Sequence, residues 1–164
     1  MRGGFIATLV FASFLAATAP AGADSSPPIT GLQSMTVTAS SHAASAHRVR
    51  LTMTLRYRMQ CNYPGSGPLA VIFPKALKVP KQLAAGAVQL AGEPIAATVA
   101  GRQVTVTVKP PAGVLCGMIG PGLLKLVFTR KAHLANPGAP GSYRFTATHS
   151  DHKFTAKLAI KAAG

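Results

Sequence analysis

The stretch RVRLTMTLRYRMQC, residues 48–61, alternates without a break between apolar and polar side chains. Every odd position carries an apolar residue or a cysteine, and every even position carries a polar one. Successive side chains of a β-strand point to opposite faces, so the pattern predicts a half-buried strand. The outer face of this strand would carry four arginines: Arg48, Arg50, Arg56 and Arg58.

Most of the remaining chain shows the same alternation of apolar and polar residues. Further strands are predicted at residues 36–38, 95–99, 104–108, 124–128, 143–147 and 154–160. The apolar run LAVIF, residues 69–73, predicts a strand buried on both faces, and only KQLAAG, residues 81–86, suits a helical turn. A tight hairpin is expected at residues 100–103. About seven to nine short strands separated by turn residues predict an all-β fold, an antiparallel β-sandwich.

The N-terminal residues have the layout of a secretory signal peptide. Arg2 precedes an apolar segment at residues 5–18, and an A-x-A cleavage site follows at residues 21–23. The apolar segment is shorter than the roughly 20 residues that a membrane span needs. A cleaved signal peptide is therefore expected, with an uncleaved anchor as the alternative.

The predicted organisation is a signal peptide at residues 1–23, an N-terminal extension with the first strand at 24–47, and the rest of one β-sandwich domain at 48–164. No transmembrane segment is expected after cleavage. The mature chain is expected to be secreted or periplasmic and associated with the cell envelope.

The charge balance points to anionic partners. The chain has 17 lysines and arginines against three acidic residues, a formal net charge of +14. Most cations therefore have no acidic partner within the chain, and such a field attracts anionic surfaces. Envelope polymers, lipid head groups and nucleic acid all fit this charge. A solvated basic surface that only keeps the protein soluble fits it equally well.

The arginine face predicts which anions suit it. Proteins that bind single-stranded nucleic acid interleave cations with aromatic rings on one face. Tyr57 lies between Arg56 and Arg58 in sequence, but alternation sends it to the opposite face. The face thus favours phosphate or carboxylate groups of an anionic polymer, and nucleic acid only without sequence specificity. The alternative is that the arginines discourage edge-to-edge aggregation.

The two cysteines, Cys61 and Cys116, predict a disulfide, because an even pair in an exported chain is usually oxidised. Such a bridge would close a loop of about 56 residues and contribute roughly 4 kcal/mol in the chain-entropy description.

A metal site is the alternative to a charged binding face. His149 and His152 flank Asp151 in one predicted turn, and these three side chains could share a metal ion. Polar histidines are also ordinary in a hairpin turn. We expect the turn to be structural and the protein to need no cofactor, with a small exported metal- or ligand-binding protein as the alternative function.

Catalysis has little support in the sequence. The three acids, Asp24, Glu93 and Asp151, lie far apart along the chain, and no G-x-S-x-G motif occurs. Hydrolysis of glycosides normally needs two opposed carboxyl groups. The protein is therefore expected not to be an enzyme, unless catalytic residues are assembled only in space.

Several short motifs carry a family resemblance over roughly residues 50–160. They are Phe73-Pro74, Val79-Pro80, Val104 to Val108, Asn136-Pro137 and Gly141-Ser142-Tyr143. With these motifs the chain resembles the immunoglobulin-like β-sandwich domains of bacterial and archaeal surface-layer and adhesive surface proteins. The resemblance implies an extracellular scaffolding, adhesive or presentation role without a common catalytic residue. The chain departs from that pattern because it holds one copy, a cysteine pair and a strongly basic surface.

Overall fold

The computed structural model describes residues 34–59, 66–109, 120–149 and 152–164. In these ranges the chain forms ten β-strands and one short 3-10 helix. The strands are β1 (Ser34–Ala39), β2 (Leu51–Met59), β3 (Gly67–Ile72), β4 (Val88–Leu90), β5 (Glu93–Pro94), β6 (Ala97–Ala100), β7 (Gln103–Val108), β8 (Gly120–Phe128), β9 (Gly141–His149) and β10 (His152–Ile160), and the helix is η1 (Arg130–Ala132).

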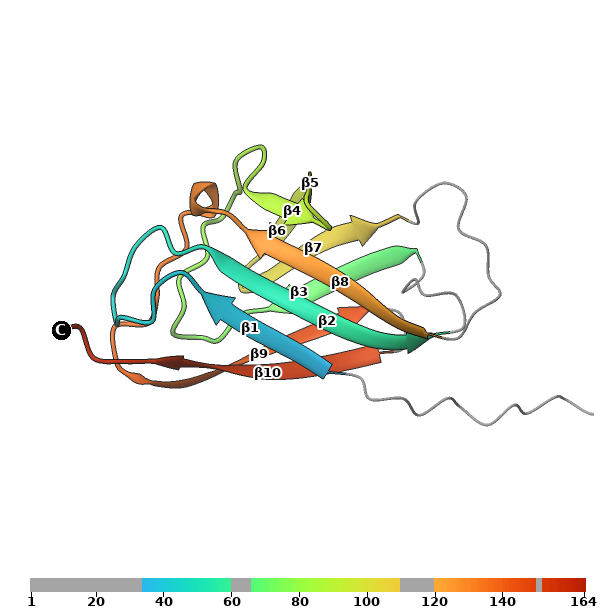
Figure 1. Cartoon of the computed structure of the whole chain (residues 1–164). Helices are drawn as coiled ribbons and strands as arrows, with labels where there is room; N and C mark the ends of the chain where they lie inside the picture. Colours follow the sequence, from blue (N-terminus) through green and yellow to red (C-terminus); the bar gives the residue numbers. More distant parts are fainter. Residues whose placement is uncertain (1–33, 60–65, 110–119, 150–151) are drawn as a thin grey trace, which may run out of the picture.

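The strands form two antiparallel sheets that pack face to face (Figure 1). The first sheet has the order β1-β2-β8-β4-β5, and the second has the order β10-β9-β3-β7-β6. This confirms the predicted all-β sandwich. The strand number exceeds the expected seven to nine because β4 and β5, with three and two residues, are too short to show a period in the sequence.

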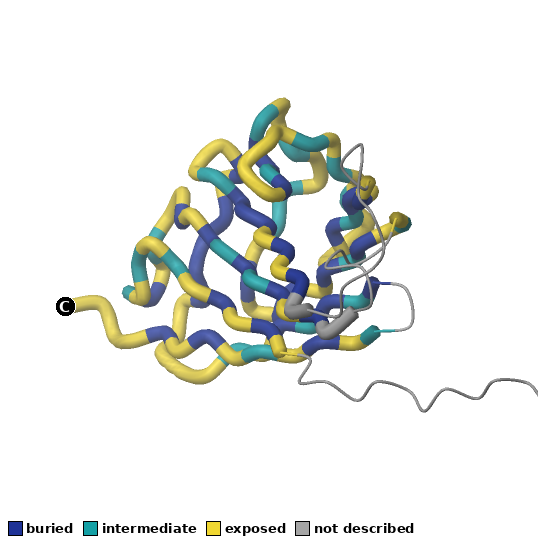
Figure 2. Tube along the Cα trace, turned by 45° about the vertical axis from the view of Figure 1, so that its right-hand side comes forward, coloured by how far each residue is buried: buried dark blue, intermediate teal, exposed yellow. Residues whose placement is uncertain are grey.

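The core lies between the two sheets and takes the inward residues of each. Leu51, Met53, Leu55 and Tyr57 of β2 are at most 1% exposed, as alternation predicts. The second sheet contributes inward residues such as Leu69 and Val71. Figure 2 shows how buried and exposed residues alternate along the strands. Burial of one such side chain contributes about 1.5–3 kcal/mol, so the two apolar faces hold the sheets together.

Three aromatic rings join the sheets at the centre of this core. Phe73 follows β3 and meets Phe128 of β8 edge to face, with 5.1 Å between the ring centroids. It also meets Phe145 of β9, at 5.7 Å. Because Phe128 belongs to the first sheet and Phe145 to the second, Phe73 packs against both.

Two predictions about local structure were wrong. The LAVIF strand is buried on one face only: Ala70 is half-buried and Ile72 is 37% exposed. Among the described residues, no third layer covers the outer face of its sheet, so the outward side chains of this apolar run are partly exposed to solvent. The KQLAAG segment, residues 81–86, forms bends and a turn instead of a helix, and the one helical turn of the described residues is η1.

The predicted hairpin is confirmed. β6 and β7 are joined by Gly101 and Arg102, and Gly101 has a φ of +60°. A two-residue connection between twisted strands needs such left-handed backbone, which glycine adopts without strain.

Several expectations fall on segments outside the described residues. The signal peptide at residues 1–23 is one, and the disulfide between Cys61 and Cys116 is another. Both stay predictions. Within the described ranges, no helix is long and apolar enough to cross a membrane.

The contrast between Phe73 and its neighbour Ile72 provides a test of the core. Phe73→Ala should lower the free energy of unfolding by about 3–5 kcal/mol, because it opens a cavity against two other rings. Ile72→Ala, on the outer face, should cost about 1 kcal/mol or less. Urea unfolding of both variants measures the difference. Similar losses would contradict the assigned facing of β3.

Candidate functional site

Among the described side chains, two of the four arginines of the opening stretch lie on the outer side of the first sheet. Arg50 and Arg56 are exposed, whereas their neighbours Val49 and Leu51 are buried. Arg58 belongs to β2, and its side chain lies outside the described residues. Arg48 is exposed but precedes the strand, with a left-handed φ of +53°. Arg48 therefore does not belong to the predicted row of arginines on one strand face.

The register shows what surrounds the row. β2 lies between β1 and β8, so it is an interior strand. Arg56 is paired with Ser34 of β1 and Leu123 of β8. Thr54 is paired with Lys125, which is also exposed. The outer face of the first sheet thus carries cations spaced by threonines, without a partner acid on these strands.

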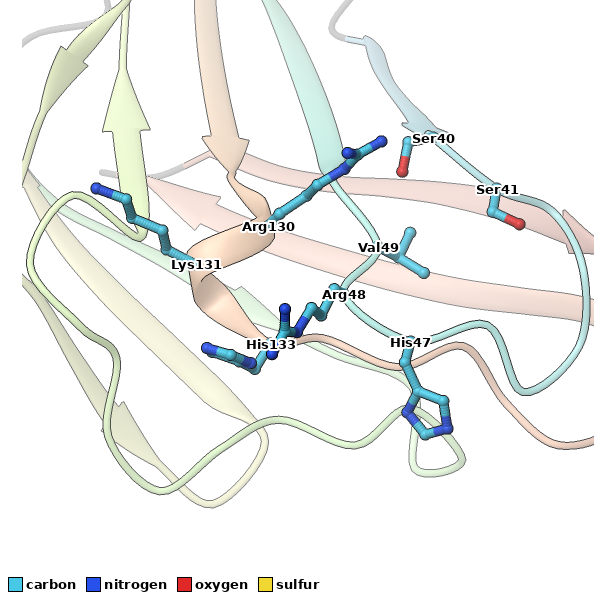
Figure 3. A pocket seen from close by; sticks show the side chains of 8 residues that line it. All are labelled: Ser40, Ser41, His47, Arg48, Val49, Arg130, Lys131 and His133. Carbon is cyan, nitrogen blue, oxygen red and sulfur yellow. The ribbon is translucent and has the colours of Figure 1, made fainter.

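Arg48 is directed instead into a concentrated site at one end of the sandwich. A hollow of about 640 Å³ opens there, and we call it the basic hollow (Figure 3). Its lining consists of Ser40, Ser41, His47, Arg48, Val49, Arg130, Lys131 and His133. Three of these residues are always cationic at neutral pH, two are histidines, and none is acidic.

The short helix η1 supplies one wall of the basic hollow. Its backbone closes through the Ala132 N–H, which donates to the Thr129 carbonyl at 2.9 Å. Ala132 faces the core and is 1% exposed, so Arg130 and Lys131 are left in solvent. His133 ends the helix with a left-handed φ of +49°. One turn of helix therefore places Arg130, Lys131 and His133 in succession along this wall, with the Arg130 and Lys131 side chains pointing in different directions (Figure 3).

A buried asparagine ties this wall to the opposite one. The Asn136 side-chain amide donates two hydrogen bonds of 2.9 Å, to the carbonyls of Ser41 and Ala43. The Asn136 N–H donates to Ala46 at 2.8 Å, and the Val49 N–H donates to Leu134 at 3.0 Å. The segment that carries His47 and Arg48 is thereby held against the segment that follows η1.

Sequence reasoning missed most of this site. It singled out Arg48, but not His47, Arg130, Lys131 or His133. These residues lie in two segments more than eighty positions apart, and nothing in either segment marks it as the other's neighbour. The sequence signal that did exist was the Asn136-Pro137 pair, which was valued only as a family motif.

Asn136 should therefore matter for both stability and the geometry of the hollow. Asn136→Ala removes the side-chain donor from the Ser41 carbonyl and leaves the Ala43 carbonyl with only the 3.4 Å hydrogen bond from the Ala46 N–H, which should cost about 1–3 kcal/mol. Gln103→Ala, on an exposed side chain of β7, is the matched control and should change stability by about 0.5 kcal/mol or less. Urea unfolding followed by circular dichroism measures both. An effect of Asn136→Ala within the range of the control would contradict the role assigned to the amide.

His149 is the buried polar side chain that the predicted turn does not explain. It ends β9, is 1% exposed, and is paired across the hairpin with His152. Its ring meets that of Tyr57 edge to face at 5.8 Å, and His152 meets Tyr57 at 5.9 Å. Neither ring nitrogen of His149 has a hydrogen-bond partner among the described residues. Extending the inward series Phe145, Ala147 by one step would have predicted this burial.

The environment of His149 disfavours its charged form. Burial, and to a lesser extent the charge of His152, lower the pKa of His149 from its ordinary value of 6.5. Asp151, the third candidate ligand, lies outside the described residues. Among the residues that the structure describes, no group of three His, Cys, Asp or Glu side chains is placed to hold a metal ion. The expectation that this turn does not bind metal stays a prediction.

The lowered pKa of His149 links stability to pH. The unfolded chain binds a proton at this position near pH 6.5, while the folded protein resists doing so. The contribution to stability is complete above about pH 6.5 and is lost as the pH falls below it. His149→Phe should reduce this acid destabilisation, measured as the midpoint of thermal unfolding between pH 7.5 and 5. The exposed-site variant His47→Ala should retain it. Identical pH profiles for the wild type and His149→Phe would show that another group is responsible.

No protein-family model matches the sequence, and no curated protein is significantly similar to it. Among solved structures, the chain is similar to BslA, described as a bacterial hydrophobin. The sequence identity is 19% and the TM-score is 0.48, over 79% of this chain and 99% of that chain. A similarity of this size does not assign a function.

Proposed function

We propose that the protein is an exported, non-catalytic β-sandwich that binds anionic polymers of the cell envelope through its basic surface. The observation that carries the proposal is the basic hollow, which is lined by Arg48, Arg130, Lys131 and two histidines and by no acid. The outer face of the first sheet extends this surface with Arg50, Arg56 and Lys125. We refer to the hollow and this face together as the first basic surface.

The cations that line the hollow and the sheet face repel one another, and bound anions would lessen this repulsion. Asn136 and η1 fix the segments that carry these cations at one end of the sandwich, although cations spread over the whole surface would be more favourable by Coulomb's law. Phosphate or carboxylate groups relieve this repulsion. Arginine can in addition donate two parallel hydrogen bonds to such a group. A polymer with a repeating anion would engage the hollow and the sheet face at once.

The non-catalytic character has independent support. Glu93 is the only carboxylic side chain among the described residues, and it lines an apolar hollow of about 600 Å³ beside Leu90 and Leu123. The residues that line this hollow are mostly apolar, whereas those that line the basic hollow are mostly polar or charged. The scaffolding role and the immunoglobulin-like character come from the resemblance to surface-layer and adhesive domains, and the secreted or periplasmic location comes from the N-terminal signal-like segment.

The decisive experiment compares two triple variants with the same loss of charge. Arg48→Gln, Arg130→Gln and Lys131→Gln together remove the cations of the basic hollow. Lys75→Gln, Lys78→Gln and Lys81→Gln remove three exposed lysines that do not line it. Three contacts of about 0.5–1 kcal/mol each predict at least a tenfold weaker affinity for heparin or polyphosphate in the hollow variant. The lysine variant should lose about threefold or less.

The salt dependence of polymer binding by the same variants provides a second test. Binding through released counterions weakens steeply as salt rises, and the hollow variant should show a shallower slope than the lysine variant. Equal affinities and slopes for the two variants would mean that net charge alone attracts the polymer. The hollow would then have no special role.

A further inference from the structure

The outer face of the second sheet carries its own set of cations. Arg144 of β9 and Lys153 and Lys157 of β10 are all exposed. On β10 the inward side chains are Phe154 and Leu158, which are 2% exposed. Alternation therefore directs Lys153 and Lys157 away from the core. We call Arg144, Lys153 and Lys157 the second basic face.

The pairing within this face is unusual for a surface meant only to be solvated. Arg144 stands directly opposite Lys157 in the antiparallel register of β9 and β10. Like charges in directly opposed positions destabilise a sheet. Neither strand carries an acid that could neutralise the pair. A shallow hollow of about 510 Å³ lies at this point, lined by Arg144, Thr155, Ala156 and Lys157.

The second basic face and the first basic surface belong to different sheets. Arg50 and Arg56 point outward from the first sheet, whereas Arg144 and Lys157 point outward from the second. Two packed sheets are separated by about 10 Å, and the buried core fills the space between them. In Figure 1, β2 and β8 lie on one side of the molecule and β9 with β3 on the other. The edge strands β1 and β10 are in contact, so a polymer that lies straight along one face would have to bend around this edge to reach the other.

From this geometry we infer that one copy of the protein holds two anionic chains, one on each face, and so cross-links the polymer. The inference rests on the proposed function and adds the number of chains bound. It differs from simple binding in its consequence, because a bivalent protein joins particles that a monovalent one only coats.

The test uses beads coated with heparin and full-length mature protein at a few copies per bead. Wild-type protein should bind the beads and cluster them, seen as an increase in particle size by light scattering. Arg144→Gln, Lys153→Gln and Lys157→Gln together should leave most binding intact through the first basic surface but reduce clustering at least fivefold. The variant Lys75→Gln, Lys78→Gln and Lys81→Gln, with the same net charge, should cluster beads almost as well as the wild type.

The outcomes separate this inference from the proposed function. If the wild type does not bind the beads, the proposed function fails. If the wild type binds without clustering, or if the second-face variant clusters as the lysine variant does, binding stands and bivalence is overturned. Should the triple variant lose its β-sheet circular dichroism, the double variant Arg144→Gln and Lys157→Gln replaces it and is held to the same expectation.

Discussion

An unpaired cation is too costly to bury, and this constraint governs the arrangement of the whole molecule. With 17 lysines and arginines and only three acids, the chain has almost no means of neutralising a cation in its interior. Every lysine and arginine whose side chain is described is exposed. Successive side chains of a strand point to opposite faces, so a strand whose apolar residues face the core has its cations on the outer face. Core and charged surface are two results of one pattern.

The same constraint explains why polar contacts inside the sandwich are few and specific. Asn136, 5% exposed, is neutral and can therefore be buried where a lysine could not. Its amide holds residues 41–43 against the segment after η1 without adding charge. His149 is tolerated in the core for the same reason, because its lowered pKa keeps it neutral at physiological pH. Asn136 thus shapes the end of the sandwich at which the basic hollow lies, whereas His149 packs beside Tyr57 near the other end of β2.

The sequence predicted what depends on periodicity and missed what depends on topology. The facing of Val49 to Tyr57 follows from alternation alone and was confirmed. The LAVIF strand was misjudged, since an apolar run does not reveal whether a third layer covers it. The basic hollow was missed because its two walls, residues 40–49 and 130–133, come together only through the packing of the folded chain. His149 lay within reach of the alternation rule, but its place beside a polar turn concealed it.

The interior position of several cations argues that the basic surfaces do more than protect the sheet edges. Lysines on an edge strand such as β10 discourage pairing with another chain, and Lys153 and Lys157 can serve that purpose. Arg56 on β2 and Lys125 on β8 cannot, because each of these strands already has a neighbour on both sides. Solubility does not account for the pairing of Arg144 with Lys157, since scattered charges keep a protein soluble without placing two cations opposite each other. The proposed binding of anions across neighbouring strands would account for cations at these interior positions.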